Sequence, residues 1–373
     1  MYFCPVNKNI EASRVKIIDK YILKKYFATF LGLMLLFIPI SIIFDLSERI
    51  DKIFENDIPL GEVIKYYGNF TLYFFNLLFP IFLFLSIIWF TSRLAQNTEI
   101  IAMLNTGMPF MRFLRPYLIG ATIIAMTVLF LNFSIIPKAR ISYHDFWTKY
   151  IKKYKKVRET NDIYRKIDSI HYVYASNLNH KNKTAYNFIY EEIKDNQLKS
   201  RIFADRIVWM PEQKKYRLHN VRERIYLDQD KEKINTYSVK DTIFPFTLDD
   251  LTPIVYAAEG LNYIELNKFI EKEKIRGSKN INVFLLEKYK RISLPVSAFI
   301  LTFIAVAVAS RKKRSGIGYS ILFGIVISLM YVFFDKVFGI LSTKSGFNPF
   351  WAAWIPNILF GLIAIYLINK ARK

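Results

Sequence analysis

Long apolar runs alternate with polar segments along this chain, and six of the runs contain no Asp, Glu, Lys or Arg. Each run has 16 to 20 residues, and three precede and three follow a polar middle section. At a rise of about 1.5 Å per residue, a helix of that length crosses roughly the 30 Å hydrocarbon core of a bilayer. The pattern therefore predicts six transmembrane helices. These are Tyr26–Phe44, Leu72–Phe90, Tyr117–Ile136, Leu294–Ala309, Ile317–Phe334 and Trp351–Ile368.

The middle section changes to a period of two, which is typical of strands with one buried face. Residues 201–209 alternate clearly, and polar clusters typical of turns separate this run from its neighbours. We predict an antiparallel all-β domain of sandwich or jellyroll type, followed by helices at Tyr263–Lys274 and Asn280–Arg291 with a break at Gly277. The predicted strands are His171–Ala175, Ala185–Tyr190, Arg201–Met210, Tyr216–His219, Ile225–Leu227 and Thr242–Leu248.

Together these elements predict a polytopic α-helical membrane protein with six transmembrane helices and an inserted, jellyroll-like β domain. Residues 1–136 form the N-terminal membrane half, residues 137–290 the β domain with its trailing helices, and residues 291–373 the C-terminal membrane half. Sixteen Lys and Arg residues lie next to one side of the predicted spans, and five lie in the short loops of the other side. Under the positive-inside rule we expect both termini to be cytoplasmic and residues 137–290 to lie on the opposite side of the membrane.

The sequence lacks the motifs of several functional classes. Despite a net charge of +22 it has no RNA- or DNA-binding motif, so we expect no nucleic acid partner. It has no phosphate-binding G-x-x-x-x-G-K-[ST] loop and no nucleophile elbow, so we expect no catalysis by this chain and no cofactor. Cys4 is the only cysteine, and the four histidines lack metal-ligand spacing. Energy for any transport must therefore come from a partner.

Residues 92–106 are too polar to span a bilayer, but apolar residues recur in them near helical spacing. These apolar positions are Leu94, Ile101, Leu104 and, just beyond the segment, Met108. We predict a short amphipathic helix on the cytoplasmic side, followed by Gly107, where glycine can adopt a positive φ. The only charges of the segment are Arg93 and Glu99. Such a helix can lie on lipid or dock into a basic groove of a soluble protein, and the residues alone leave both interpretations open.

Residues 98–107, Thr-Glu-Ile-Ile-Ala-Met-Leu-Asn-Thr-Gly, resemble the coupling-helix motif of the LptF/LptG (YjgP/YjgQ) permease family. Other stretches are similar to this family in the same order along the chain, and the resemblance covers essentially its whole length. They are Asp19–Ile22, Leu286–Pro295, Asp335–Gly339 and Trp354–Asn357. The Asp-x-x-Phe-Gly pattern at residues 335–339 favours the LptG-like half of the family.

The resemblance implies a permease subunit of an ATP-driven exporter that extracts lipopolysaccharide from the Gram-negative inner membrane and passes it to a periplasmic jellyroll bridge. It implies three protein partners: a cytoplasmic ABC ATPase dimer, a second LptF/LptG-type permease and the bridge protein. ATP hydrolysis would belong to the ATPase, which would bind the coupling helix of this chain. The residues that we expect at this contact are Arg93, Glu99, Ala102, Met103 and Gly107.

Lipopolysaccharide has acyl chains and an anionic head, so it needs an apolar cavity and attracts basic groups. The Phe- and Leu-rich first, second and fifth spans are suited to line such a cavity, and residues 137–293 have a net charge of +11. That charge either attracts phosphorylated lipid or only keeps the domain soluble. Family members often place a cation at the outer end of the first span. Here Arg49 and Lys52 are the substrate-contact candidates, but they interleave with acidic residues, and a salt bridge or a snorkelling side chain explains them equally well.

Two alternative functions remain open from the residues. A membrane-anchored periplasmic sensor or scaffold, whose β domain binds a protein, also fits the absence of charge inside the spans. A permease of another ATP-driven exporter, for lipoprotein or peptide, fits the same layout. Crosslinking of substrate to the first and fifth spans would separate transport from scaffolding. The cargo that accumulates on depletion would separate the two exporters.

Overall fold

The computed structural model describes residues 17–151, 160–180, 182–227, 231–251, 257–311 and 316–372. Several residues that entered the charge and cysteine arguments lie outside this part of the chain, namely Cys4, the cations before position 17, Lys312, Lys313, Arg314 and Lys373. Contacts divide the chain into a helical unit, residues 1–139 and 289–373, and a β unit, residues 140–288.

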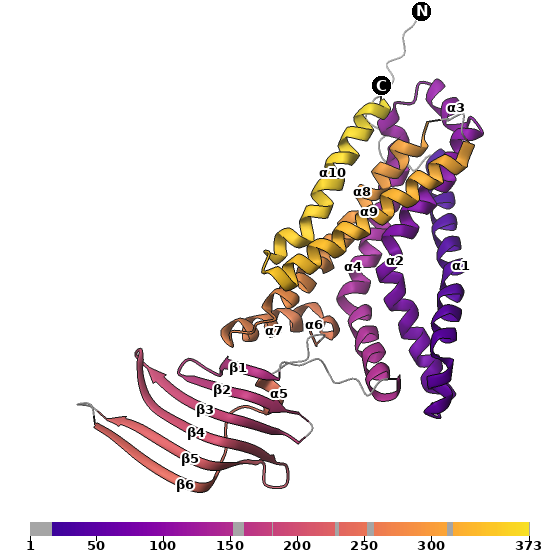
Figure 1. The fold of residues 1–373 in the computed structure, drawn as a ribbon. Helices are drawn as coiled ribbons and strands as arrows, with labels where there is room; N and C mark the ends of the chain where they lie inside the picture. Colours follow the sequence, from indigo (N-terminus) through magenta and orange to yellow (C-terminus); the bar gives the residue numbers. More distant parts are fainter. Residues whose placement is uncertain are drawn as a thin grey trace, which may run out of the picture. The chain divides into compact units, whose positions relative to one another are not determined.

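Among the described residues, six helices are long and apolar enough to cross a membrane, as the sequence predicts (Figure 1). Each contains one predicted span and continues beyond it, because an apolar run marks only the part of a helix suited to hydrocarbon. Three of these helices precede the β domain and three follow it. They are α1 Ile17–Glu55, α2 Leu60–Gln96, α4 Phe110–Phe146, α8 Ile281–Ala309, α9 Gly316–Ser345 and α10 Pro349–Arg372.

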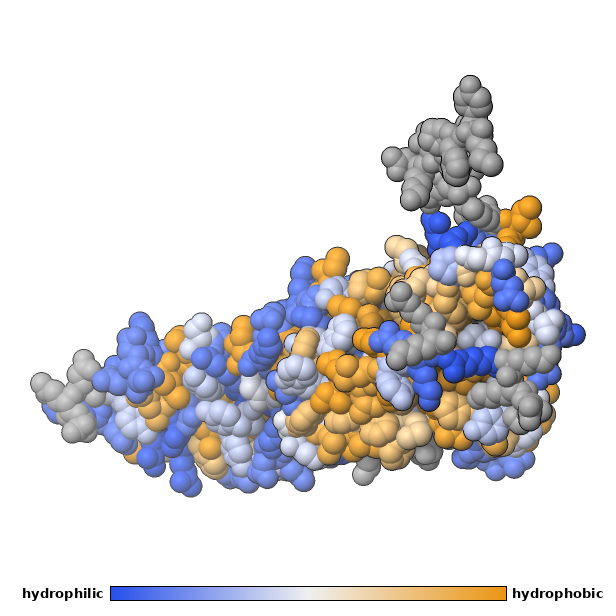
Figure 2. All heavy atoms as spheres, turned by 90° about the horizontal axis from the view of Figure 1, so that it is seen from above, coloured by the Kyte–Doolittle hydropathy of each residue, from blue (hydrophilic) through white to orange (hydrophobic). Residues whose placement is uncertain are grey.

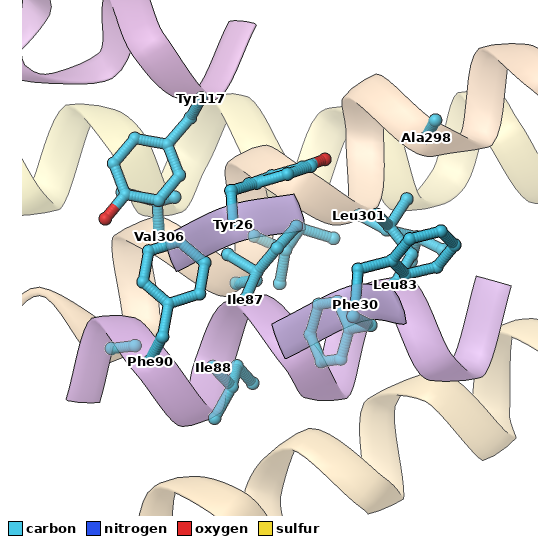
Figure 3. Close-up of a cluster of buried hydrophobic side chains, with 14 of the residues drawn as sticks. Tyr26, Phe30, Leu83, Ile87, Ile88, Phe90, Tyr117, Ala298, Leu301 and Val306 are labelled. Carbon is cyan, nitrogen blue, oxygen red and sulfur yellow. The ribbon is translucent and has the colours of Figure 1, made fainter. Parts of the chain in front are cut away.

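The core of the helical unit is built largely from side chains of α1, α2, α4 and α8 (Figure 3). Buried side chains of α1 recur every four residues and so form one face of the helix: Ile22, Tyr26, Phe30 and Met34. Tyr26 packs edge-on against Phe90 of α2, whose ring stacks on Tyr117 of α4. The Tyr26 hydroxyl lies 3.4 Å from that of Thr302 on α8. A polar group inside this apolar core therefore has a hydrogen-bonding partner, as burial requires.

Two helices of this unit leave most of their apolar surface uncovered. In the most apolar part of each helix, 11% of the α1 residues and 22% of the α9 residues are buried, against 67% for α8. Figure 2 shows extensive hydrophobic surface over the helical unit. Such a surface is stable in lipid, whereas in water it would drive association. The exposed side chains include Leu31, Leu35, Ile40, Ile43 and Phe44 on α1, and Leu322, Leu329, Phe333 and Ile340 on α9.

The β unit contains one six-stranded antiparallel sheet, in which each strand pairs with the next along the chain (Figure 1). Its strands are β1 Asn161–Lys166, β2 His171–Asn179, β3 Thr184–Lys194, β4 Gln197–Met210, β5 Lys215–Leu227 and β6 Lys231–Thr242. The predicted antiparallel β domain between the two sets of helices is thus confirmed. Its described strands form a meander, whereas the crossovers of a sandwich or jellyroll also pair strands that are distant in sequence.

One face of the sheet, called the inner face below, is buried. Apolar side chains at alternate positions form it, among them Val173, Phe188 and Ile207. The segment after β6 joins this cluster through Phe244 and Phe246. The Phe244 ring lies 4.9 Å from that of Tyr190, and burial raises the pKa of Tyr190 to about 12. The domain's own aromatic side chains therefore fill the inner face.

The structure corrects several strand predictions. Tyr216–His219 and Ile225–Leu227 belong to one strand, β5. The prediction of a strand at Thr242–Leu248 is wrong, because β6 ends at Thr242 and the apolar residues that follow cover the inner face. β1 and most of β6 were not predicted, since both are edge strands. Edge strands often carry polar residues, and almost all of β6 is exposed, so it has no alternation to detect.

Short helices follow the sheet within the β unit: α5 Leu248–Leu251, α6 Ala257–Gly260 and α7 Tyr263–Ile275. The predicted helices after the strands are confirmed by α7 and by the first part of α8. Gly277 lies between them with a φ of +68°, a conformation that glycine adopts without strain. At the start of α7 the Asn262 side chain accepts from the Glu265 amide, and the Glu265 carboxylate accepts from the Asn262 amide. This capping box fixes where α7 begins.

Candidate functional site

The segment between the second and third spans contains a short helix, α3, at Glu99–Asn105. The helix predicted over 92–106 is therefore too long at its start, because residues 92–96 are the last turn of α2. Asn97 and Thr98 separate the two helices, and Thr98 has a φ of +61°. A non-glycine residue rarely adopts this left-handed conformation, so the sequence gives little warning of the break.

The break changes which face of α3 is buried. Ile100 is only 1% exposed, and Met103 and Leu104 pack partly buried against the core of the helical unit. Ile101, predicted on the buried face, is 43% exposed. The prediction was wrong here because it carried one helical phase across residues 97–98, where the chain interrupts the helix. Ile101 and Ala102 therefore present a small exposed surface on α3.

Glu99 lies in the first turn of α3, half-buried, and α1 holds its side chain. The Tyr21 hydroxyl donates a hydrogen bond of 2.8 Å to Glu99 Oε2, and Asn97 Nδ2 donates one of 3.4 Å to Oε1. The Lys25 ammonium lies 4.4 Å from the centre of the Tyr21 ring, a distance at which a cation is attracted to the ring. A carboxylate can accept about four hydrogen bonds. Glu99 is therefore oriented by this chain while keeping acceptor capacity for a partner.

The other residues predicted at this contact have different surroundings. Ala102 and Gly107 are exposed, and Met103 is half-buried with its side chain against the core. Arg93 is exposed on the last turn of α2, before the break. Four of the five predicted contact residues, all except Arg93, thus lie on α3 or in the turn that follows it. Their contact with a partner stays a prediction.

A buried ion pair beside this segment was not predicted from the sequence. Asp19 of α1 is 2% exposed, and both of its carboxylate oxygens accept a 2.7 Å hydrogen bond from the Arg112 guanidinium of α4. The two-bond geometry fixes both side chains and so joins the beginnings of α1 and α4. In the sequence, Asp19 stands out only as part of a motif similar to the family's, and Arg112 only as one of the loop cations. No spacing relates two residues that are 93 positions apart.

The substrate-contact candidates lie near the other end of α1, beyond an apolar groove between α1 and α2. The groove is shallow and is lined by Met34, Phe37, Ile38, Ser41, Phe70, Thr71, Phe74, Phe75, Leu78 and Phe82. Arg49 forms a 2.7 Å ion pair with Asp45, which also accepts a 3.1 Å hydrogen bond from Tyr66 of α2. Lys52 is exposed in the last turn of α1. Whether Arg49 or Lys52 contacts a substrate stays a prediction.

We expect Gly107→Ala to lower the thermal stability slightly, with little effect on the α3 surface. Gly107 has a φ of +86°, and an added Cβ would meet no atom within 4 Å. The cost is therefore backbone strain alone, about 1 kcal/mol. Gly61 lies inside α2 with equally open space, so Gly61→Ala should be neutral or slightly stabilising. Melting temperatures of the two purified variants check this, and an unchanged Gly107→Ala protein would contradict it.

Six membrane-length helices, an inserted β domain and a short helix between the second and third spans together define a multi-pass membrane protein. A model of the family of lipopolysaccharide export system permeases LptF/LptG matches residues 20–370, and this chain belongs to that family. The chain is 21% identical to the lipopolysaccharide export system permease protein LptG of Escherichia coli K12, over 95% of this chain and 98% of the relative. It is 20% identical to LptG of Haemophilus influenzae, over 96% of this chain and 99% of the relative.

Proposed function

We propose that this protein is a permease subunit of an ATP-driven lipopolysaccharide exporter and that it is LptG-like. The observation that carries the proposal is the family match over residues 20–370, together with two relatives named LptG that align over nearly their whole length. The uncovered apolar surface of α1 and the apolar groove beside it support a lipid substrate, since acyl chains need contact with hydrocarbon-like side chains.

The chain has no phosphate-binding loop, so a separate ATPase supplies the energy in this proposal. Its dimer docks on α3 from the cytoplasm, with the oriented carboxylate of Glu99 facing a cation of the ATPase and with Ile101 and Ala102 as apolar contacts. Two features support docking over a helix that only lies on lipid. Glu99 is already held by Tyr21, and the buried apolar side of α3 packs on this protein's own core, so it is not available to lipid.

The same proposal places the protein in the inner membrane with both termini cytoplasmic and the β domain in the periplasm. The excess of Lys and Arg beside the cytoplasmic ends of the spans supports this orientation. A second LptF/LptG-type permease completes the membrane part, and the poorly covered helices α1 and α9 are suited to face it. A periplasmic jellyroll protein then receives the lipid.

The proposal is tested by depletion and crosslinking. Lipopolysaccharide should accumulate in the inner membrane on depletion, and a photo-crosslinker at Ile38 or Phe74, which line the α1–α2 groove, should give ATP-dependent lipopolysaccharide adducts. Leu362 of α10 is 64% exposed and serves as the control for simple contact with lipid, where any adduct should not depend on ATP. Accumulation of a lipoprotein instead, or adducts only with proteins on the β domain, would favour the exporter of another cargo or the scaffold.

A further inference from the structure

The outer face of the sheet, opposite the aromatic inner face, carries a line of polar residues across five strands. Each strand from β2 to β6 contributes one residue to this line, and we call the set the polar seam. Its members, in strand order, are Ser176, Asn187, Asp205, Asn220 and Ser238. Strand pairing continues on both sides of the seam and is interrupted at Asn187, Asp205 and Asn220. Asn187 and Asn220 have φ values of +46° and +52°. The backbone is thus bent at the seam in conformations that asparagine tolerates better than most residues.

Side chains of the seam are exposed or half-buried and hydrogen-bond to one another. Asn187 Nδ2 donates to Ser176 Oγ at 3.0 Å, and Asn220 Nδ2 donates to Asp205 Oδ2 at 2.8 Å. The remaining lone pairs and amide hydrogens face away from the buried core. The seam therefore offers donors and acceptors side by side in a fixed arrangement. Hydroxyl groups, each of which both donates and accepts, match this arrangement.

Two arginines flank the seam, one on each side. Arg206 is in register with Tyr186 and His219, and Arg222 is in register with Phe203. Both arginines are exposed, and neither has a hydrogen bond or ion pair among the residues that the structure describes. Other arginines on the same face are paired with carboxylates. Arg201 lies 2.6 Å from Glu191, and hydrogen bonding to Arg217 lowers the pKa of Asp241.

The composition of this surface selects a chemical class of ligand. Guanidinium groups bind phosphate with two parallel hydrogen bonds, and the exposed Tyr186 ring provides an apolar face for a sugar ring. The central carboxylate of Asp205 accepts hydrogen bonds from sugar hydroxyls. On this basis, and resting on the proposed function, we propose that the polar seam with Arg206 and Arg222 binds the phosphorylated saccharide head of lipopolysaccharide.

The proposal predicts that the full permease complex in lipid nanodiscs binds the phosphorylated core oligosaccharide released from lipopolysaccharide, which has no acyl chains. Arg206→Gln combined with Arg222→Gln should weaken this binding about tenfold or more, because each removes a charged hydrogen-bond donor. Arg217→Gln combined with Arg224→Gln removes the same charge from the same face. Those two arginines already pair with Asp241 and Glu232, so affinity should change less than about twofold. Titration calorimetry measures both.

Phosphatase treatment of the oligosaccharide supplies a second measurement and should lower its affinity for the unmodified complex but not for the Arg206/Arg222 variant. Equal binding by all proteins, no binding by the unmodified complex, or a photo-crosslinker at Tyr186 that captures only protein would overturn the seam proposal. Depletion separates this result from the proposed function. Lipopolysaccharide that accumulates in cells while the oligosaccharide fails to bind rejects the seam alone, and oligosaccharide binding without accumulation rejects the exporter.

Discussion

Glu99→Arg should nearly abolish coupling between this permease and its ATPase. The change places a cation where the proposal needs a carboxylate, so an attractive contact becomes repulsive, and loss of a desolvated charge pair at an interface costs about 2–5 kcal/mol. Even the lower figure weakens the affinity by about 30-fold. The measurement is co-purification of the ATPase with the permease, together with the stimulation of ATP hydrolysis in nanodiscs.

Two further variants separate the charge of Glu99 from its positioning. Glu99→Gln keeps an acceptor for the Tyr21 hydroxyl and removes the charge, so it should show a large part of the loss. Tyr21→Phe keeps the charge and removes the 2.8 Å hydrogen bond that orients it, so it should show a smaller loss. The reverse order, or ATPase stimulation that survives Glu99→Arg, would show that α3 does not couple through this carboxylate.

The sequence predicted those parts of the fold that depend on long, uniform patterns. Six runs without charge became six membrane-length helices, and the alternation over residues 201–209 became β4. The family and its LptG-like character were also predicted correctly from short motifs in order. The predictions failed at positions where the backbone conformation of a single residue determines the local structure. Thr98 interrupts a helix by its backbone conformation and shifts the buried face from Ile101 to Ile100, and no composition signal accompanies such a conformation.

Long-range contacts were the other limit. Arg165 of β1 is a charged residue for which the sequence suggests an exposed position. In the structure it is 1% exposed and donates hydrogen bonds to the carbonyl oxygens of Leu251 and Gly277. The strand pattern shows which face a residue takes but not what covers that face. In the same way, the cations near the outer end of α1 could be counted from the sequence, but the ion pair between Arg49 and Asp45 and its link to Tyr66 required the packing of α1 on α2.

Asp19→Asn should destabilise the helical unit strongly. The variant leaves the Arg112 guanidinium beside a buried amide, and removal of one member of a buried ion pair costs about 3–5 kcal/mol, because the remaining charge has no counterion. Arg112 keeps 22% of its side chain exposed, which places the expected loss near the lower figure. Thermal unfolding of the purified protein in a fixed detergent measures the effect as a fall in melting temperature.

A matched pair on the same unit tests this reasoning. Lys290 and Asp335 lie 2.7 Å apart, as close as Asp19 and Arg112, and the two cations are similarly exposed, but the side chain of Asp335 is 23% exposed where that of Asp19 is 3% exposed. Solvent therefore screens the attraction between Lys290 and Asp335 more strongly, and Asp335→Asn should cost only about 0.5–1 kcal/mol. The double variant Asp19→Asn with Arg112→Gln removes both charges and should be more stable than Asp19→Asn alone, since no buried charge then lacks a partner. A double variant no more stable than Asp19→Asn would contradict this expectation. If the double variant is less stable than the unmodified protein, the pair contributes a net attraction that exceeds its desolvation cost. Its role in joining α1 to α4, next to the helix that carries Glu99, would then be energetic as well as geometric.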